Sequence, residues 1–263
     1  VNDERDFSRP VVMRRKALPR KTANTLRVLI VADTHEQEWE LGRLPEADVF
    51  IHAGDILEGS SYKNDSTNMG ALHRFRAWLK EVKATRKIVI GGNHDAYMEQ
   101  IGEAKCYEEL SSKPHELDDP MNYLEYTMDD CSLPDVNLIG SLRVFGVPFA
   151  DGNTCNNAFR KEVPSMNHIK NCLHRDARAR GERRPRLDIL VTHGPCPSIA
   201  EALKPRLLHV HGHMHKMHGI YLPGAAPQKR KSYKVGVLTV CGSVLDNRYQ
   251  FTQEPIVVDF PLV

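Results

Sequence analysis

Short apolar runs recur along the chain and are separated by polar segments. The run from Leu26 to Ala32 contains one polar residue, a pattern typical of a strand that is buried on both faces. Strands are expected at residues 26–32, 48–53, 87–90, 136–139, 142–147, 187–192, 207–211, 219–222, 235–241 and 256–260. The runs at 136–139 and 142–147 flank Gly140, which favours a hairpin or another strand pair.

A helical pattern separates the second and third strands. Leu72, Phe75, Leu79 and Val82 recur at intervals of three and four residues, which predicts an amphipathic helix. Strand, helix and strand in this order favour an α/β fold with parallel strands. The remaining expectations are a short helix with loops across the acidic residues 99–135, a loop at 150–165, a basic helix at 166–180 and a hairpin loop at 223–231.

The chain divides into a short basic segment and one domain. Residues 1–24 are polar and basic, contain Pro10 and Pro19, and lack sustained periodicity, so we expect a tail or an arm packed on the domain. Residues 25–263 contain no segment with the composition of a linker, which predicts a single domain. No apolar run approaches the ~20 residues that a membrane-spanning helix needs, so no membrane association is expected.

Charge and cysteine usage restrict the class of protein further. The net charge is only +2, but basic residues cluster at 14–16, 178–186 and 229–231. These clusters are interpreted either as solvated surfaces or as contacts to a polyanion such as a nucleic acid. The six cysteines form no Cys-x-x-Cys pair, which favours reduced thiols and a cytoplasmic, intracellular protein.

Polar side chains with metal-binding ability follow five of the predicted strands. They occur in the segments Asp33-Thr34-His35, Gly54-Asp55, Gly91-Gly92-Asn93-His94-Asp95, Thr192-His193-Gly194 and Gly212-His213-Met214-His215. In open α/β sheets, ligand-binding groups gather outside the carboxyl ends of the strands, so these side chains are expected to converge. Each segment alone is a weak signal, whereas all five in this order are a strong one.

The residue types indicate the chemistry. Mixed imidazole and carboxylate ligands suit Mn, Fe or Zn better than Ca or Mg, which prefer oxygen ligands alone. One carboxylate can bridge two cations, and two ions roughly 3.5–4 Å apart can clamp the oxygens of a displacement at phosphorus. Water bound to such an ion has a pKa of about 7, so a nucleophile is present at neutral pH.

These five segments resemble the pattern Asp-x-His, Gly-Asp, Gly-Asn-His-Asp/Glu, His, Gly-His-x-His of the calcineurin-like metallophosphoesterases. The resemblance covers roughly residues 26–260. Stretches such as Ile51-His-Ala-Gly-Asp and Asp188-Ile-Leu-Val-Thr-His-Gly-Pro are similar to the metallophosphoesterase-domain-containing (MPPED) branch, which is related to class III cyclic-nucleotide phosphodiesterases. Some members of that branch carry Gly at the position of His213, whereas this chain has the complete set.

The resemblance implies a four-layer α/β/β/α sandwich with a dinuclear metal site at the strand ends. It also implies that Asp33, His35 and His215 hold the first metal, that Asn93, His193 and His213 hold the second, and that Asp55 bridges both. His94 would contact the phosphate and protonate the leaving oxygen, with Asp95 orienting its imidazole. His52, His209, His211 and His218 match no motif position and are expected to support the fold or the ligands.

The implied activity is metal-dependent hydrolysis of cyclic nucleotides or other small phosphodiesters, by attack of a metal-bridging hydroxide. A phosphomonoesterase and a nuclease of the same superfamily are the alternatives, and a non-catalytic metal-binding scaffold is a third. Protein serine/threonine phosphatases of this superfamily carry Arg before Gly-Asn-His, where this chain has Gly91, which counts against that group. Specificity is expected to lie in loops 56–69, 96–135, 150–165 and 195–206. The oligomeric state is left open by the sequence.

Overall fold

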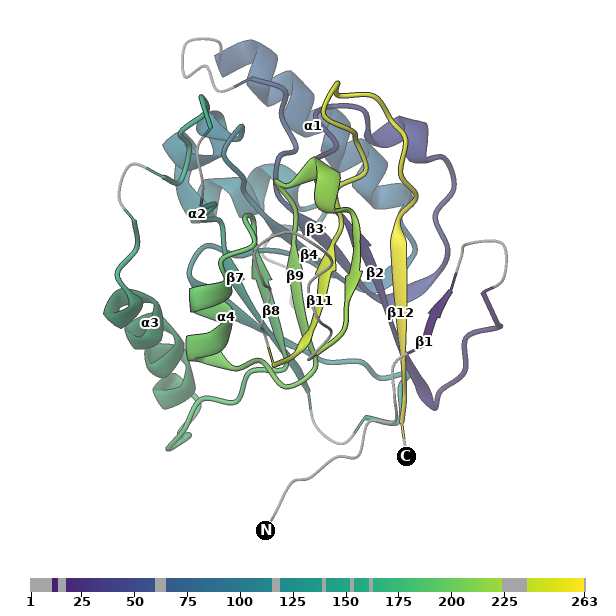
Figure 1. Ribbon diagram of the computed structural model, residues 1–263, viewed down its shortest axis with the longest axis vertical. Coiled ribbons are helices and arrows are strands. Elements are labelled where there is room, and N and C mark those ends of the chain that lie inside the picture. The colour runs from purple at the N-terminus through teal and green to yellow at the C-terminus, as the bar shows by residue number, and fades with distance from the viewer. Residues whose placement is uncertain are drawn as a thin grey trace.

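Two β-sheets packed face to face form the centre of the molecule (Figure 1). The computed structural model describes residues 11–13, 18–59, 65–114, 119–138, 141–151, 154–160, 163–223 and 236–262. The first sheet has the order β1-β12-β2-β3-β4-β5 and the second the order β10-β11-β9-β8-β7-β6. Within this part of the chain, no helix is long and apolar enough to cross a membrane.

In the first sheet, the strands β2 to β5 run parallel, and β12 and β1 pair antiparallel at one edge. In the second sheet, β7, β8, β9 and β11 run parallel between antiparallel β6 and β10. The strands are β1 Val11–Met13, β2 Thr25–Val31, β3 Ala47–Ala53, β4 Ala84–Ile90, β5 Met121–Tyr123, β6 Thr127–Cys131, β7 Leu142–Val147, β8 Ile189–Thr192, β9 Leu208–His211, β10 Gly219–Tyr221, β11 Leu238–Cys241 and β12 Ile256–Pro261.

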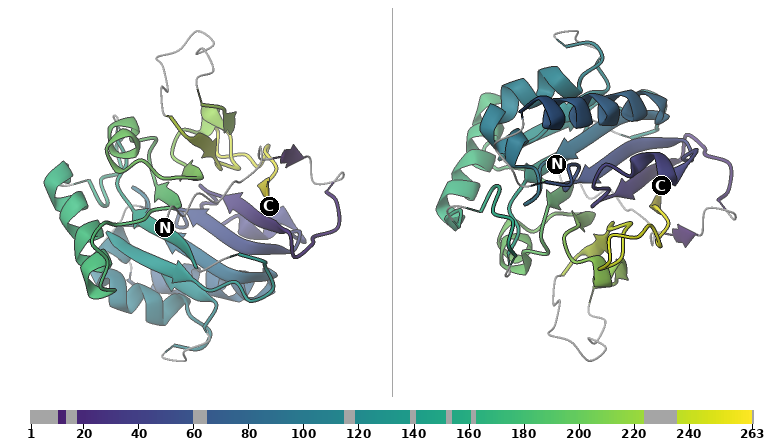
Figure 2. Two further views of the ribbon diagram at one scale, coloured as in Figure 1. Left: turned by 90° about the horizontal axis from the view of Figure 1, so that it is seen from below. Right: turned by 90° about the horizontal axis from the view of Figure 1, so that it is seen from above.

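Helices cover the outer faces of both sheets. They are α1 Asp65–Glu81, α2 Ala96–Leu110, α3 Met166–Ala179 and α4 Pro197–Leu203, with short 3-10 helices η2 Glu38–Leu41 and η3 His215–Met217. Figure 2 shows α1 and α2 side by side over the first sheet, with α3 in a different part of the molecule. In β2, Leu29 packs with α1 and α2, whereas the neighbouring Ile30 packs between the sheets. Leu190 of β8 packs with α3 and α4, while Val191 faces the first sheet. The predicted four-layer α/β/β/α class is therefore confirmed.

The expected pairing of 136–139 with 142–147 is wrong. Residues 136–138 form no strand, residues 139–140 lie outside the described part of the chain, and β7 pairs instead with β6. The region 99–135 also contains more regular structure than its acidic composition indicated, namely most of α2, with a non-helical kink at Gly102, and strands β5 and β6. Acidic residues are tolerated in β6 because Arg86 donates to both carboxylate oxygens of Asp129, at 2.9 and 3.0 Å.

The basic segment at the start of the chain contributes to the first sheet. Val11–Met13 pair with β12, and partly buried Leu18 packs against the core under α1. Lys21 makes a short ion pair with buried Asp48, which also accepts a hydrogen bond from the backbone N–H of Arg27. Residues 1–10 and 14–17 lie outside the described residues, as do the basic cluster 229–231 and most of the predicted hairpin loop. The division into an arm and one domain stays a prediction.

A buried ion pair joins the last strand to the first long one. Arg27 of β2 donates from Nε and Nη2 to the two carboxylate oxygens of Asp259 in β12, at 2.8 and 2.7 Å, and both residues are 4% exposed. If one of these charges is removed, the other stays buried without a partner and without hydrating water, which is costly.

We predict that Asp259→Ala lowers the free energy of unfolding by about 3–5 kcal/mol, since it leaves the Arg27 guanidinium buried without its partner. Urea unfolding followed by circular dichroism measures this change. Lys105→Ala is the matched control, because it removes an ion pair from the exposed face of α2 and is expected to leave the midpoint unchanged. Equal midpoints for both variants would contradict the role of the buried pair.

Candidate metal centre

The strand ends of both sheets meet at one edge of the molecule. Asp33 and His35 follow β2, Asp55 follows β3, and Asn93, His94 and Asp95 follow β4. His193 follows β8, and His213 and His215 follow β9. Hydrogen bonds join neighbouring ends, from the N–H of Asp33 to the carbonyl of Gly54 at 2.9 Å and from the N–H of Gly212 to the carbonyl of His193 at 2.8 Å. The structure therefore brings the predicted metal ligands together.

Their donor atoms form two sets that could each hold a metal ion. The atoms of Asp33, His35 and His215 lie within 4.8 Å of one another, and so do those of Asp55, His193 and His213. Asp55 also lies in a third such set with His35 and His94, so it is common to both sides of the site. The side-chain oxygen of Asn93 lies 2.9 Å from Nε2 of His193 and thus joins the second set. The division of these donors between two metal ions stays a prediction.

Backbone carbonyls fix how three of the imidazoles face the site. The Nδ1 atoms of His35, His193 and His215 lie 3.1, 2.9 and 2.9 Å from the carbonyl oxygens of Leu57, Ala53 and Asp246, respectively. In His35 and His215, an N–H donated from Nδ1 leaves the lone pair of Nε2 directed into the site, as in many metal-binding histidines. His193 also faces an acceptor with Nε2, which lies 2.9 Å from Oδ1 of Asn93, so this nitrogen must release its proton before it can bind a metal ion. The Nε2 atom of His35 is buried and has no hydrogen-bond partner among the described residues. A bound cation would satisfy this atom.

Two carboxylates are buried in the same place. Asp33 is 0% exposed, accepts from the backbone N–H of His213 at 3.0 Å, and makes a short hydrogen bond with the hydroxyl of Ser243. Asp55 is 2% exposed and accepts from the backbone N–H of His94 at 2.8 Å. Buried carboxylates need compensating positive charge or several hydrogen bonds, and a metal ion supplies the former.

Burial and neighbouring charges shift the pKa values of these donors in different directions. Burial alone would raise the pKa of the Asp55 carboxyl, but the neighbouring His193 and His35 lower it below its usual range. Burial alone would lower the pKa of His193, but Asp55 outweighs it and raises the pKa to about 9. Burial lowers the pKa of His35 and of His213 to about 3, so both are neutral and free to act as metal ligands at pH 7.

The chain adopts uncommon backbone conformations to reach this arrangement. Asp33, His35, Asp55 and His213 have φ angles of +56°, +43°, +55° and +63°, in the left-handed region that most side chains avoid. Such strain costs of order 1–3 kcal/mol per residue and persists where the surrounding structure enforces it. Gly92 allows a close approach, because a Cβ at this position would lie 2.3 Å from a carboxylate oxygen of Asp55.

One predicted contact is wrong. The Nδ1 atom of His94 lies 2.9 Å from the carbonyl oxygen of Glu58, so this carbonyl, and not Asp95, orients the imidazole. The carboxylate of Asp95 instead accepts hydrogen bonds from the backbone N–H groups of Gly92, Ile56 and Leu57, at 2.7, 3.0 and 2.8 Å. Asp95 therefore ties the loop after β4 to the loop that carries Asp55, and does not contact the ring of His94.

The remaining histidines near the site have other contacts. Nε2 of His52 lies 3.1 Å from the hydroxyl of Thr34, and Nε2 of His209 lies 2.8 Å from the hydroxyl of Thr192. Each threonine is adjacent to a predicted metal ligand, so both contacts support the backbone that presents it. His218 bonds through Nδ1 to the carbonyl of Ser243, at 2.8 Å.

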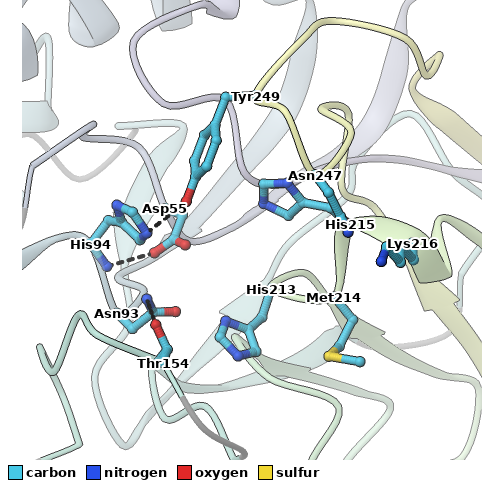
Figure 3. A pocket seen from close by; sticks show the side chains of 10 residues that line it. All are labelled: Asp55, Asn93, His94, Thr154, His213, Met214, His215, Lys216, Asn247 and Tyr249. Carbon is cyan, nitrogen blue, oxygen red and sulfur yellow. Dashed lines mark hydrogen bonds between the residues drawn. The ribbon is translucent and has the colours of Figure 1, made fainter.

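A cavity of about 360 Å³ opens above these ligands (Figure 3). Its lining includes predicted residues and also Thr154, Met214, Lys216, Asn247 and Tyr249, which no motif had indicated. Thr154 lies in the loop 150–165, which was expected to contribute to specificity. Asn247 and Tyr249 come from a turn before β12 that was not, because its sequence carries no recognisable pattern of a binding site.

The sequence is similar to proteins with the same type of domain. The model of the calcineurin-like phosphoesterase family matches residues 26–217. The UPF0046 protein C25E10.12 of Caenorhabditis elegans is 23% identical over 91% of this chain and 82% of its own length. Metallophosphoesterase domain-containing protein 1 of Homo sapiens is 25% identical over 89% of this chain and 71% of its own length.

A third relative is the probable rhamnogalacturonate lyase C of Emericella nidulans. It is 30% identical over 77% of this chain, but the matched segment is only 18% of that protein. The family model covers most of the chain, and its range contains every predicted metal ligand. The chain therefore belongs to the calcineurin-like phosphoesterase family, whose members are metal-dependent hydrolases of phosphate esters.

Proposed function

We propose that this protein is a phosphodiesterase that hydrolyses cyclic nucleotides or other small phosphodiesters with two bound metal ions. The observation that carries the proposal is the complete set of donors around Asp55, which lies at the floor of an open cavity beside His94. The cavity of about 360 Å³ is of a size that suits a small ligand.

The donors fit metal ions in number and type. Asp33, His35 and His215 would hold the first ion, Asn93, His193 and His213 the second, and Asp55 both, and the mixture of imidazole and carboxylate suits Mn, Fe or Zn. When bound, the ions supply positive charge to the phosphate oxygens and lower the pKa of a water molecule.

His94 is the proposed proton donor. Its Nδ1 donates to the carbonyl of Glu58, so the protonated ring presents Nε2–H to the cavity. During hydrolysis the oxygen of a water molecule bonds to phosphorus and the bond between phosphorus and the leaving oxygen breaks. The proton on Nε2 passes to that leaving oxygen, and the proton lost by the water balances it. A linear diester yields a phosphate monoester and an alcohol, whereas a cyclic nucleotide opens to a single nucleoside monophosphate that carries both groups.

A diester is preferred to a monoester because of the surroundings of Gly91. A monoester brings an extra negative charge, and the protein serine/threonine phosphatases that resemble this chain have an arginine at this position. Here a Cβ at Gly91 would lie 2.4 Å from the ring of Phe159, so the structure has no room for any side chain. The arginine that would mark a monoesterase of that group is therefore excluded at this position.

A nuclease activity has weaker support. It comes from the basic segment 178–186 at the end of α3 and just beyond it, in which Arg178, Arg183 and Arg184 are exposed.

The ester preference is testable with purified protein that has been loaded with Mn²⁺, Fe²⁺ or Zn²⁺. We expect kcat/KM for 3′,5′-cyclic AMP and for bis(p-nitrophenyl) phosphate to exceed that for p-nitrophenyl phosphate by at least about tenfold, or about 1.4 kcal/mol of transition-state stabilisation. Faster hydrolysis of the monoester would indicate a phosphomonoesterase. A metal-loaded protein that hydrolyses none of the three would be a scaffold.

A further prediction concerns the carboxylate of Asp55, which is common to both donor sets. Asp55→Asn removes one negative charge from between the donor sets, so we expect the metal content to fall from two ions per chain to one or none. We also expect kcat to decrease by more than about 100-fold, the scale of losing one electrostatic group from a reaction centre. Metal analysis and steady-state kinetics measure these effects.

Asp135→Asn is the matched control for this prediction, because it makes the same chemical change at an exposed position. It is expected to retain both metal ions and the wild-type rate. Wild-type metal content in Asp55→Asn would show that Asp55 does not bridge.

A further inference from the structure

A tight turn at residues 246–250 lies beyond the part of the chain that the family model matches. The carboxylate of Asp246 accepts from the backbone N–H groups of Arg248 and Gln250, at 2.8 and 3.0 Å, and its carbonyl accepts from the N–H of Tyr249 at 2.9 Å. A bridge between Leu245 and Phe251 closes the turn. The same Asp246 carbonyl accepts from Nδ1 of His215, so the turn is attached directly to the metal centre.

Tyr249 is held in this turn in an unfavourable backbone conformation. Its φ is +59°, which is rare and energetically unfavourable for a bulky residue. Tyr249 is 44% exposed, so burial of its side chain offsets only part of that cost. The side-chain amide of Gln37 donates to the Tyr249 carbonyl at 3.2 Å and helps to hold the turn. Strain of this kind at an exposed aromatic residue indicates a functional position.

The ring of Tyr249 lies over three imidazoles of the site. Its centroid is 4.8 Å from that of His35, 5.4 Å from that of His215 and 6.0 Å from that of His94. Its hydroxyl lies 3.4 Å from Nε2 of His94. Figure 3 shows the hydroxyl end of the ring pointing into the site, toward His94 and Asp55. The side-chain amide nitrogen of Asn156 lies 2.6 Å from the same Nε2 atom. Nε2 of His94 is therefore flanked by polar groups from two loops that carry none of the family motifs.

We propose that Tyr249 is a positioning residue that aligns His94 with the leaving oxygen and so sets which leaving groups the protein accepts. The inference rests on the proposed function, because it assigns Tyr249 to the proton donation by His94. The Glu58 carbonyl fixes Nδ1, and the Tyr249 hydroxyl fixes Nε2 at the cavity wall until the leaving oxygen takes its place. A leaving group that departs as an alkoxide needs this proton, whereas p-nitrophenolate departs without it.

Tyr249→Phe tests the proposal, because it removes only the hydroxyl and keeps the ring, the turn and its backbone bonds. We expect kcat for 3′,5′-cyclic AMP to fall about tenfold, the upper range for one hydrogen bond, with KM nearly unchanged. We expect kcat for bis(p-nitrophenyl) phosphate to change by less than about twofold. A residue that served only the fold would reduce both rates by the same factor.

A double-mutant cycle with His94→Asn adds a second readout. If Tyr249 acts through His94, its hydroxyl has nothing to align in the His94→Asn background, and the further substitution has no effect on either substrate. Tyr107→Phe is the matched control. It removes the hydroxyl of a tyrosine on α2 that donates to Asp119, and Tyr107 does not line the cavity. It is expected to retain wild-type rates.

The outcomes separate the two proposals. Equal losses on both substrates, no loss on either, or a persistent effect in the His94→Asn background would overturn the role of Tyr249 while the wild-type diesterase activity stands. A metal-loaded wild-type protein that hydrolyses neither diester would overturn the proposed function and this inference together.

Discussion

Two buried carboxylates that need positive charge, Asp33 and Asp55, determine how the strand ends of this protein are built. Neither can be hydrated, because they are 0% and 2% exposed. The surrounding structure supplies imidazoles whose Nδ1 atoms are bonded to backbone carbonyls, so that Nε2 faces the carboxylates. This arrangement requires left-handed backbone at several ligands and a glycine at position 92, where a side chain would collide with Asp55. The fold tolerates that strain because both sheets hold the loops at their carboxyl ends.

Much of this centre was predictable from sequence because each ligand closely follows the end of an apolar strand. The spacing of Asp33 and His35, or of His213 and His215, is local, and parallel strands bring such local segments to one edge. The contact of His94 with the carbonyl of Glu58 was not predictable, because every residue carries a carbonyl and no side chain marks this one. Asp95 was a reasonable candidate by proximity, but three backbone N–H groups already occupy its oxygens.

Long-range pairing accounts for the other differences. Strand β6 contains two aspartates and lacks the composition of a strand, and it forms because Arg86, more than forty positions earlier, neutralises Asp129. Tyr249 and Asn156 are separated by more than ninety positions, yet both approach Nε2 of His94. The loop 150–165, which contains Asn156, was expected to contribute to specificity, but no motif marks Tyr249, so the role proposed for Tyr249 emerges only from the structure. The shared centre lies within the matched range 26–217, and the turn at 246–250 lies outside it.

The two donor sets around Asp55 are proposed to hold two metal ions at once. Anomalous diffraction from crystals of the wild-type protein grown with Mn²⁺ tests this most directly. We predict two anomalous peaks per chain, one contacting Asp33, His35 and His215, the other contacting Asn93, His193 and His213, with Asp55 contacting both. A single peak at saturating metal, or peaks away from these donors, would contradict it.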